Sequence, residues 1–166
     1  KLKEIIVALI FTALIRTLIG LVPAIILTAP LFGVSILNLG FPLLLLFLSL
    51  YIFGITLGLF VSAGLIRFGP SFENIAWSSL FLLAPLGCIY YPIEILPTFF
   101  QIIAKGLPLV YIFDETRNIL LNGLINYENL TKAYVLNILY LVCGISLFYF
   151  SFLKARIKGT LINMGE

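Results

Sequence analysis

The segment that decides the fold is Tyr91–Gly123, which reads YPIEILPTFFQIIAKGLPLVYIFDETRNILLNG. It is strongly apolar, but three prolines and five charged residues interrupt it: Pro92, Pro97, Pro108, Glu94, Lys105, Asp114, Glu115 and Arg117. A membrane-spanning helix needs about 20 mostly apolar residues, and the most apolar piece here, Ile95 to Ala104, has about half of that length. That piece would reach roughly 15 Å into a hydrocarbon core of about 30 Å. We therefore expect the segment to enter the bilayer and leave on the same side, covered by protein.

The composition is that of an integral membrane protein. Hydrophobic residues make up 62% of the 166 residues and charged residues only 10%, whereas about 25% is typical of a soluble domain. Apolar segments recur as far as residue 153, which a signal peptide alone would not explain. The net charge of +3 is too small to indicate nucleic-acid binding, and basic residues near apolar segments are better explained as orientation signals.

The chain begins at Lys1 rather than Met and enters an apolar helix at once. We therefore expect the C-terminal fragment of a longer protein, forming a single transmembrane domain over 1–166. Its predicted membrane-spanning helices cover about 5–29, 42–66, 75–91 and 133–153. No charged residue occurs between Arg16 and Arg67, a run too long for one span, and turn-forming residues at 30–42 divide it.

Basic residues predict that both ends of the chain are cytoplasmic. Three of them follow the last predicted span: Lys154, Arg156 and Lys158. Cytoplasmic loops carry an excess of Lys and Arg, so four spans put Arg67 inside and 92–132 outside. The predicted fold is an all-α, multi-pass bundle in the plasma membrane, with four transmembrane helices and an external re-entrant helical hairpin over about 93–123.

Two features of the predicted spans concern packing and charge. Gly54, Gly58 and Ser62 recur every four residues, and small residues at this spacing let helices approach closely in lipid. They predict packing within the bundle or, alternatively, a contact between subunits. Arg16 is the one ionisable residue clearly within a span. It either reaches the inner interface, lies in a helix that begins earlier, or faces the bundle or an anionic substrate.

The sequence lacks the residues that would carry catalysis or ion coupling. It has no histidine, no Gly-x-Ser-x-Gly motif and no Gly-Lys dipeptide, so it contains no P-loop. Its predicted spans hold no Asp or Glu of the kind that ion-coupled carriers use. Cys88 and Cys143 lie in apolar segments and are interpreted as packing residues. We therefore predict no catalytic, cofactor or metal site and no enzymatic activity in this chain, with ATP used only by a separate chain or domain.

Within 93–123 the pattern predicts two short helices. Apolar residues over 99–103 form one face of the first helix, which ends at Gly106 and Pro108. The second helix ends at Gly123, which is expected as its C-cap. The pair is interpreted as a re-entrant hairpin, and the alternative is a pair of amphipathic helices lying flat on the bilayer.

The carboxylates of this segment, Glu94, Asp114 and Glu115, are interpreted as solvated or salt-bridged groups on the outer side. Asp114 and Arg117 are three residues apart, a spacing at which they can pair on a helix surface.

The same segment resembles the C-terminal signature of ABC-2 type transporter permeases, which reads approximately Tyr-Pro, Leu-Pro, then Pro, an aromatic residue, Arg and a closing Gly. The positions of the segment that belong to this signature are Tyr91, Pro92, Glu94, Pro97, Pro108, Arg117 and Gly123. The chain departs from the family at 113–117, which reads FDETR where many relatives carry FEGMR.

The resemblance implies a permease with six spans, of which the predicted four would be the last. It implies a homodimer or a pair of permease halves, bound to a cytoplasmic ABC ATP-binding subunit that holds ATP and magnesium. Such a permease would export a polysaccharide, a lipid or a drug-like substrate, and Glu94 and Arg117 would anchor the hairpin at the interface. Two other classes stay open: an ion-coupled secondary transporter or channel, and a membrane-embedded enzyme that uses Glu94 or Asp114.

Overall fold

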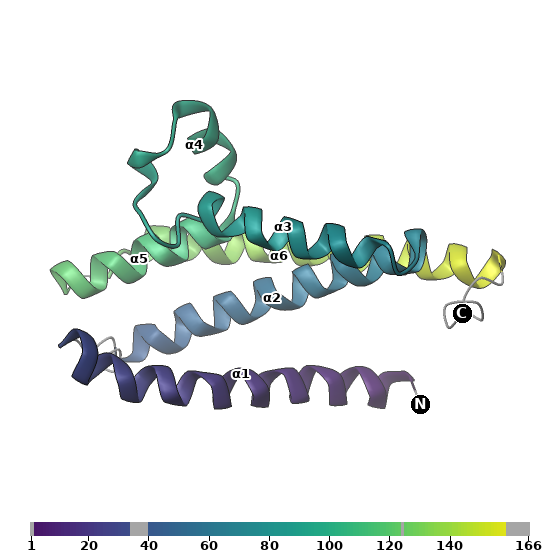
Figure 1. The fold of residues 1–166 in the computed structure, drawn as a ribbon, viewed down its shortest axis with the longest axis horizontal. Coiled ribbons are helices and arrows are strands. Elements are labelled where there is room, and N and C mark those ends of the chain that lie inside the picture. Colours follow the sequence, from purple (N-terminus) through teal and green to yellow (C-terminus); the bar gives the residue numbers. More distant parts are fainter. Residues whose placement is uncertain (1, 34–39, 124, 159–166) are drawn as a thin grey trace. The chain divides into compact units, whose positions relative to one another are not determined.

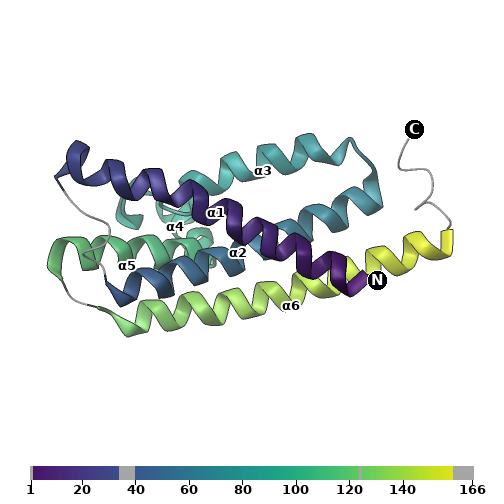
Figure 2. The same ribbon diagram turned by 90° about the horizontal axis from the view of Figure 1, so that it is seen from below.

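The computed structural model describes residues 2–33, 40–123 and 125–158 (Figures 1 and 2). Every regular element within these residues is helical. The helices are α1 (Leu2–Phe32), α2 (Phe41–Phe68), α3 (Phe72–Leu86), α4 (Thr98–Ala104), α5 (Pro108–Asn122) and α6 (Tyr127–Lys158), and a 3-10 turn, η2 (Ile93–Ile95), precedes α4. The protein is therefore all-α, as its composition predicts.

Three of these helices are long and apolar enough to cross a membrane. The apolar stretches cover Ile10–Thr28, Phe41–Phe68 and Tyr127–Ile157. Each has a mean hydropathy of 2.0 or more, although little of its length is buried by other parts of the chain. Apolar surface left uncovered on this scale needs a nonaqueous environment. The length and composition of these three helices confirm the predicted membrane association.

The chain divides into two compact units, Lys1–Phe47 and Leu48–Glu166, which are described separately. The first unit is dominated by α1, whose 31 residues extend over about 46 Å. Thr12 and Thr17 each donate a hydroxyl hydrogen bond to the carbonyl four residues earlier, over 2.7 and 2.8 Å. These bonds satisfy the hydroxyl donors within the helix itself, which suits an apolar environment.

Within the second unit, α2 and α6 contact each other through a few buried side chains. The Asn137 amide of α6 donates hydrogen bonds to the carbonyl and the hydroxyl oxygens of Ser49 on α2, over 2.9 and 2.7 Å. Both residues are fully buried. One turn farther along, the rings of Phe53 and Tyr140 meet edge to face at 6.4 Å. A polar clamp and an aromatic pair thus hold the two helices together.

Gly144 lets the two helices stay close farther along. A Cβ atom at Gly144 would lie 3.4 Å from Cβ of Leu59 and 3.5 Å from the carbonyl oxygen of Thr56. The contacting residue numbers rise together on both helices, so α2 and α6 run in the same direction, as both views show (Figures 1 and 2).

The helix expected over 75–91 is shorter than predicted. It turns back from α2 at Gly69, where φ is +79°, and its first residue, Phe72, packs against Gly64. It then ends at Leu86, because Cys88 adopts a left-handed backbone conformation with φ of +53°. The 15 residues of α3 extend over about 22 Å, and α3 is not among the helices long enough to span a membrane by themselves.

The second helix of the predicted hairpin, α5, packs along α6 and runs in the opposite direction (Figures 1 and 2). Gly123 ends it with φ of +66° and donates its N–H to the carbonyl of Ile119 over 2.9 Å. This left-handed C-cap is the one that the sequence predicts.

Candidate functional site

The most distinctive site lies where α3 stops and α5 begins. A Cβ atom at Gly87, directly after α3, would come within 2.8 Å of the Leu109 side chain at the start of α5. Both α3 and α5 run opposite to α6, and α5 begins close to the point where α3 ends. The residues between them, 89–107, form an excursion that carries η2 and α4 (Figure 1). We call this arrangement the α3/α5 break.

The end of α3 has its carbonyl groups satisfied by nearby residues. The last carbonyls of a helix have no partner within the helix. Here the N–H of Gly87 donates to the Leu83 carbonyl over 2.7 Å. The Pro85 carbonyl accepts from the N–H of Cys88 over 3.2 Å and from the Tyr91 hydroxyl over 2.9 Å. A helix can end away from water only with such partners.

Arg117 completes this arrangement from α5. Its Nη1 donates a hydrogen bond to the carbonyl oxygen of Cys88 over 2.9 Å. Its Nη2 is buried and lies 3.6 Å from a carboxylate oxygen of Asp114 on the same helix. A cation at the C-terminal end of a helix also interacts favourably with the helix dipole, here that of α3. The i,i+3 pairing of Asp114 and Arg117 that the sequence predicts is therefore present, and Arg117 has a second role that the spacing alone does not indicate.

A small apolar core joins the excursion to the α3/α5 break. Cys88, Ala104 and Val110 are buried together, and Tyr91, Ile93, Leu96 and Leu107 pack around them. Outside this core, large apolar side chains of α4 are exposed: Phe99, Phe100, Ile102 and Ile103. The excursion thus has a packed apolar interior and an exposed surface that is also apolar.

Three side chains hold the backbone of the excursion through carbonyl oxygens. The Gln101 amide donates to Leu96 over 2.8 Å, and the Tyr111 hydroxyl donates to Lys105 over 3.0 Å. The third bond comes from α6, where the Tyr140 hydroxyl donates to the Gly106 carbonyl over 3.0 Å. The hinge between α4 and α5 is therefore fixed to a defined level of α6.

Glu115 is the site residue that the sequence reasoning missed. The sequence predicts a solvated or salt-bridged carboxylate at this position, but the Glu115 side chain is only 1% exposed. One carboxylate oxygen accepts a hydrogen bond of 2.6 Å from the N–H of Asn126, just before α6. A carboxylate is stabilised at a helix N-terminus, so Glu115 joins α5 to the beginning of α6. No short-range pattern marks a contact between residues 11 positions apart across a turn.

The signature residues other than Gly123, which ends α5, lie in or bond to the α3/α5 break and the excursion. Pro92 precedes η2, Pro97 precedes α4 and Pro108 is the first residue of α5, so each proline begins a helical element. Tyr91 and Arg117 bond to the end of α3, as described above. Glu94 is exposed, and the described ion pairs of Arg117 do not include it.

The other predicted residues lie away from the break. Gly54 and Gly58 are exposed on α2, and a Cβ atom at either would meet nothing within 4 Å. Ser62 is half-buried. Arg16 is exposed on α1, which belongs to the first unit.

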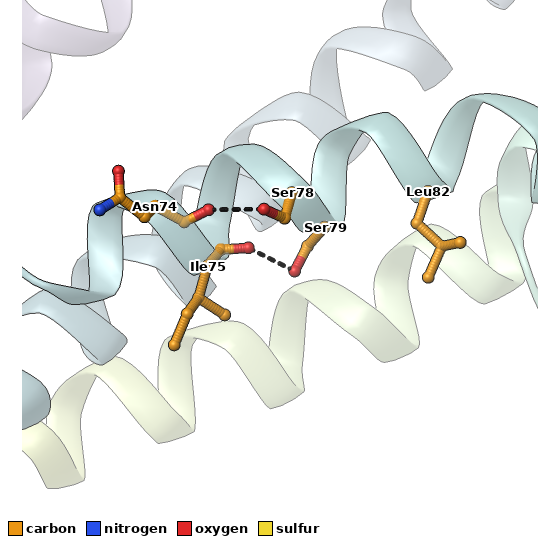
Figure 3. A pocket seen from close by; sticks show the side chains of 5 residues that line it. All are labelled: Asn74, Ile75, Ser78, Ser79 and Leu82. Carbon is orange, nitrogen blue, oxygen red and sulfur yellow. Dashed lines mark hydrogen bonds between the residues drawn. The ribbon is translucent and has the colours of Figure 1, made fainter.

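A hollow on α3 is lined by Asn74, Ile75, Ser78, Ser79 and Leu82 (Figure 3). Its hydroxyls are already engaged, because Ser78 and Ser79 donate to the carbonyls of Asn74 and Ile75 over 2.9 and 2.8 Å. The described part of the chain also contains no cluster of three or more metal-ligating side chains.

Comparison with known proteins assigns the chain to no family. No protein-family model, no curated protein and no solved structure matches it.

Proposed function

We propose that the chain is the membrane-embedded permease part of an ATP-driven exporter of the ABC-2 type. The observation that carries the proposal is the hydrogen bond between Tyr140 and Gly106. It fixes the hinge of the α4–α5 pair partway along a helix long enough to span a membrane.

The depth of this hinge favours a re-entrant hairpin over a pair of helices lying on the surface. Between Lys132 and Lys154, α6 has no charged residue, and this section covers about 30 Å, the thickness of a hydrocarbon core. Tyr140 lies eight residues after Lys132, which is about 12 Å along the helix. With α6 across the bilayer, the Gly106 hinge lies more than a third of the way in.

The parallel direction of α2 and α6 supports a fourth crossing. When both helices span the membrane, the chain leaves α2 on one side and enters α6 on the other. Residues 69–126 must then cross once. In this proposal α3 and α5 make that crossing jointly, broken at Cys88, where Arg117 and Tyr91 satisfy the interrupted backbone. Broken helices of this kind at membrane depth are found where protein or a cavity covers the backbone.

The partners of the proposed permease follow from what the sequence lacks. It contains no P-loop motif, so ATP and magnesium belong to an ABC ATP-binding subunit on the cytoplasmic side. The permease works as a homodimer or with a second permease half in the plasma membrane. ATP binding shifts the pair between two arrangements with different contacts, and the hairpin acts as the gate for a polysaccharide, lipid or drug-like substrate.

Labelling of single cysteines tests the topology. In a Cys143→Ser background, where the remaining Cys88 is buried, a membrane-impermeant maleimide is added to intact cells. We expect Leu121→Cys, at the exposed end of α5, to react quickly, and Lys154→Cys to react only after permeabilisation. Lys105→Cys, next to the hinge, should react much more slowly than Leu121→Cys. Equal rates for Lys105→Cys and Leu121→Cys would place the hinge at the surface and overturn the re-entrant arrangement.

Purification of the full-length protein from its native membrane tests the function. We expect a P-loop protein in fixed stoichiometry and ATPase activity in the purified complex. Transport in ATP-free vesicles that follows an ion gradient would instead establish an ion-coupled carrier.

A further inference from the structure

Three cations lie at the end of the α2–α6 pair that is far from the α3/α5 break. Arg67 is in the last turn of α2, and Lys154 and Arg156 are near the end of α6. All three side chains are exposed.

The register between α2 and α6 places these three residues at about the same height along the helix pair. Asn137 contacts Ser49 and Gly144 contacts Thr56, and both pairs are 88 residues apart. The same offset places Arg67 opposite position 155. The residue there, Ala155, is 5% exposed. The flanking residues on α6 are the two cations.

Large apolar side chains are exposed among the cations. Phe68 is 64% exposed, and the Arg67 guanidinium lies 5.4 Å from the centre of its ring. Phe150 and Ile157 are 67% and 85% exposed on the same part of α6. Cations interleaved with exposed apolar groups, at the end of an uncharged span, fit the boundary between lipid headgroups and acyl chains.

Charge at this end is unbalanced. Within the described part of the second unit, Glu73 in the first turn of α3 is the one carboxylate at this end, and no ion pair joins it to the three cations. We propose that Arg67, Lys154 and Arg156 form a binding site for the phosphate-bearing headgroup of an anionic phospholipid. The acyl chains would lie along the exposed apolar side chains next to the cations.

Native mass spectrometry of the full-length protein in detergent tests the site, with phosphatidylglycerol as the probe and phosphatidylcholine as the neutral lipid. We expect the wild-type protein to retain phosphatidylglycerol preferentially. The double variant Arg67→Gln/Lys154→Gln should bind phosphatidylglycerol more than tenfold less tightly, because each cation near a membrane surface contributes about fivefold in affinity.

The matched control is Lys105→Gln/Lys132→Gln, which removes the same charge elsewhere in the second unit and should leave phosphatidylglycerol binding unchanged. The variant Arg67→Lys/Lys154→Arg keeps both charges and should bind like the wild type, even where the Gln variant folds poorly. If the Gln double variant and the control lost phosphatidylglycerol affinity equally, the effect would come from net charge alone. That result would overturn the proposed binding site. Unchanged lipid binding with loss of a co-purifying protein would make the cluster a protein-docking surface instead.

Discussion

The Arg117 guanidinium donates a hydrogen bond to the carbonyl oxygen of Cys88 over 2.9 Å, from one side of a chain break to the other. Cys88 is fully buried and has a left-handed backbone, which a residue with a side chain adopts only at a cost of about 1–3 kcal/mol. The guanidinium therefore stabilises a conformation that the local sequence does not favour. Its own charge is offset by Asp114, which also accepts a hydrogen bond from Asn129 of α6 over 3.3 Å.

Replacing Arg117 with leucine should destabilise the second unit by about 1–3 kcal/mol, because the Cys88 carbonyl is left without a partner in a buried place. Unfolding in a denaturing detergent series, followed by Trp77 fluorescence, measures the effect. The control Lys132→Leu removes a cation whose ion pair with Glu128 is exposed, and its effect should be small. Equal effects of the two substitutions would contradict a specific role for Arg117.

The bond between Asn137 and Ser49 should contribute measurably to the pairing of α2 and α6. Hydrogen bonds between membrane helices contribute about 0.6 kcal/mol on average and up to about 1.7. Because Asn137 bonds both the carbonyl and the hydroxyl of Ser49, Asn137→Ala should cost more than Ser49→Ala. A double-mutant cycle in the same unfolding assay gives the coupling.

Ser146→Ala serves as the control for this cycle. The Ser146 hydroxyl is exposed on α6 and bonds only within its own helix, to the Val142 carbonyl. Additive effects of the Asn137 and Ser49 substitutions, with no coupling, would show that the clamp does not hold the helices together.

The long helices could be predicted from the sequence because hydropathy and turn residues mark them directly. Their ends could not, because hydropathy marks the part of a helix that suits lipid, whereas helical geometry continues into polar sequence. The predicted span at 133–153 is the uncharged middle of α6, which begins at Tyr127 and continues through Lys154 and Arg156.

The break at Cys88 and the polar contacts could not be predicted for a different reason. Cys88 is an apolar residue in an apolar stretch, so neither its residue type nor its hydropathy indicates a left-handed backbone. Glu115 is surrounded in sequence by polar residues, and its burial depends on Asn126 beyond the next turn. The bond from Asn137 to Ser49 joins residues 88 positions apart. Each depends on tertiary contacts, which periodicity does not report.

Gly87 should tolerate no side chain. A methyl group there would come within 2.8 Å of both the Leu109 side chain and the Leu83 carbonyl oxygen, and overpacking of this kind costs about 1–3 kcal/mol. Gly87→Ala should therefore lower stability in the same assay. Gly58→Ala is the matched control, because a methyl group at Gly58 meets nothing within 4 Å. A comparable loss at Gly58 would show instead that its exposed face is covered by another helix in the membrane.

Loss of the Tyr140 hydroxyl should free the hinge between α4 and α5. Tyr140→Phe keeps the ring against Phe53 but removes the hydrogen bond to the Gly106 carbonyl. The global stability should fall by only about 1 kcal/mol, whereas local opening of the hinge becomes more frequent. Combined with Lys105→Cys, the substitution should raise the rate of maleimide labelling several-fold.

Tyr127→Phe is the control for this measurement, because Tyr127 is exposed at the start of α6, far from the hinge along the helix. It should leave the labelling of Lys105→Cys unchanged. An unchanged rate in Tyr140→Phe as well would mean that packing of Cys88, Ala104 and Val110 holds the hinge without the hydroxyl. A several-fold rise in Tyr140→Phe alone would identify the bond to Gly106 as the contact that sets how readily the hinge is exposed.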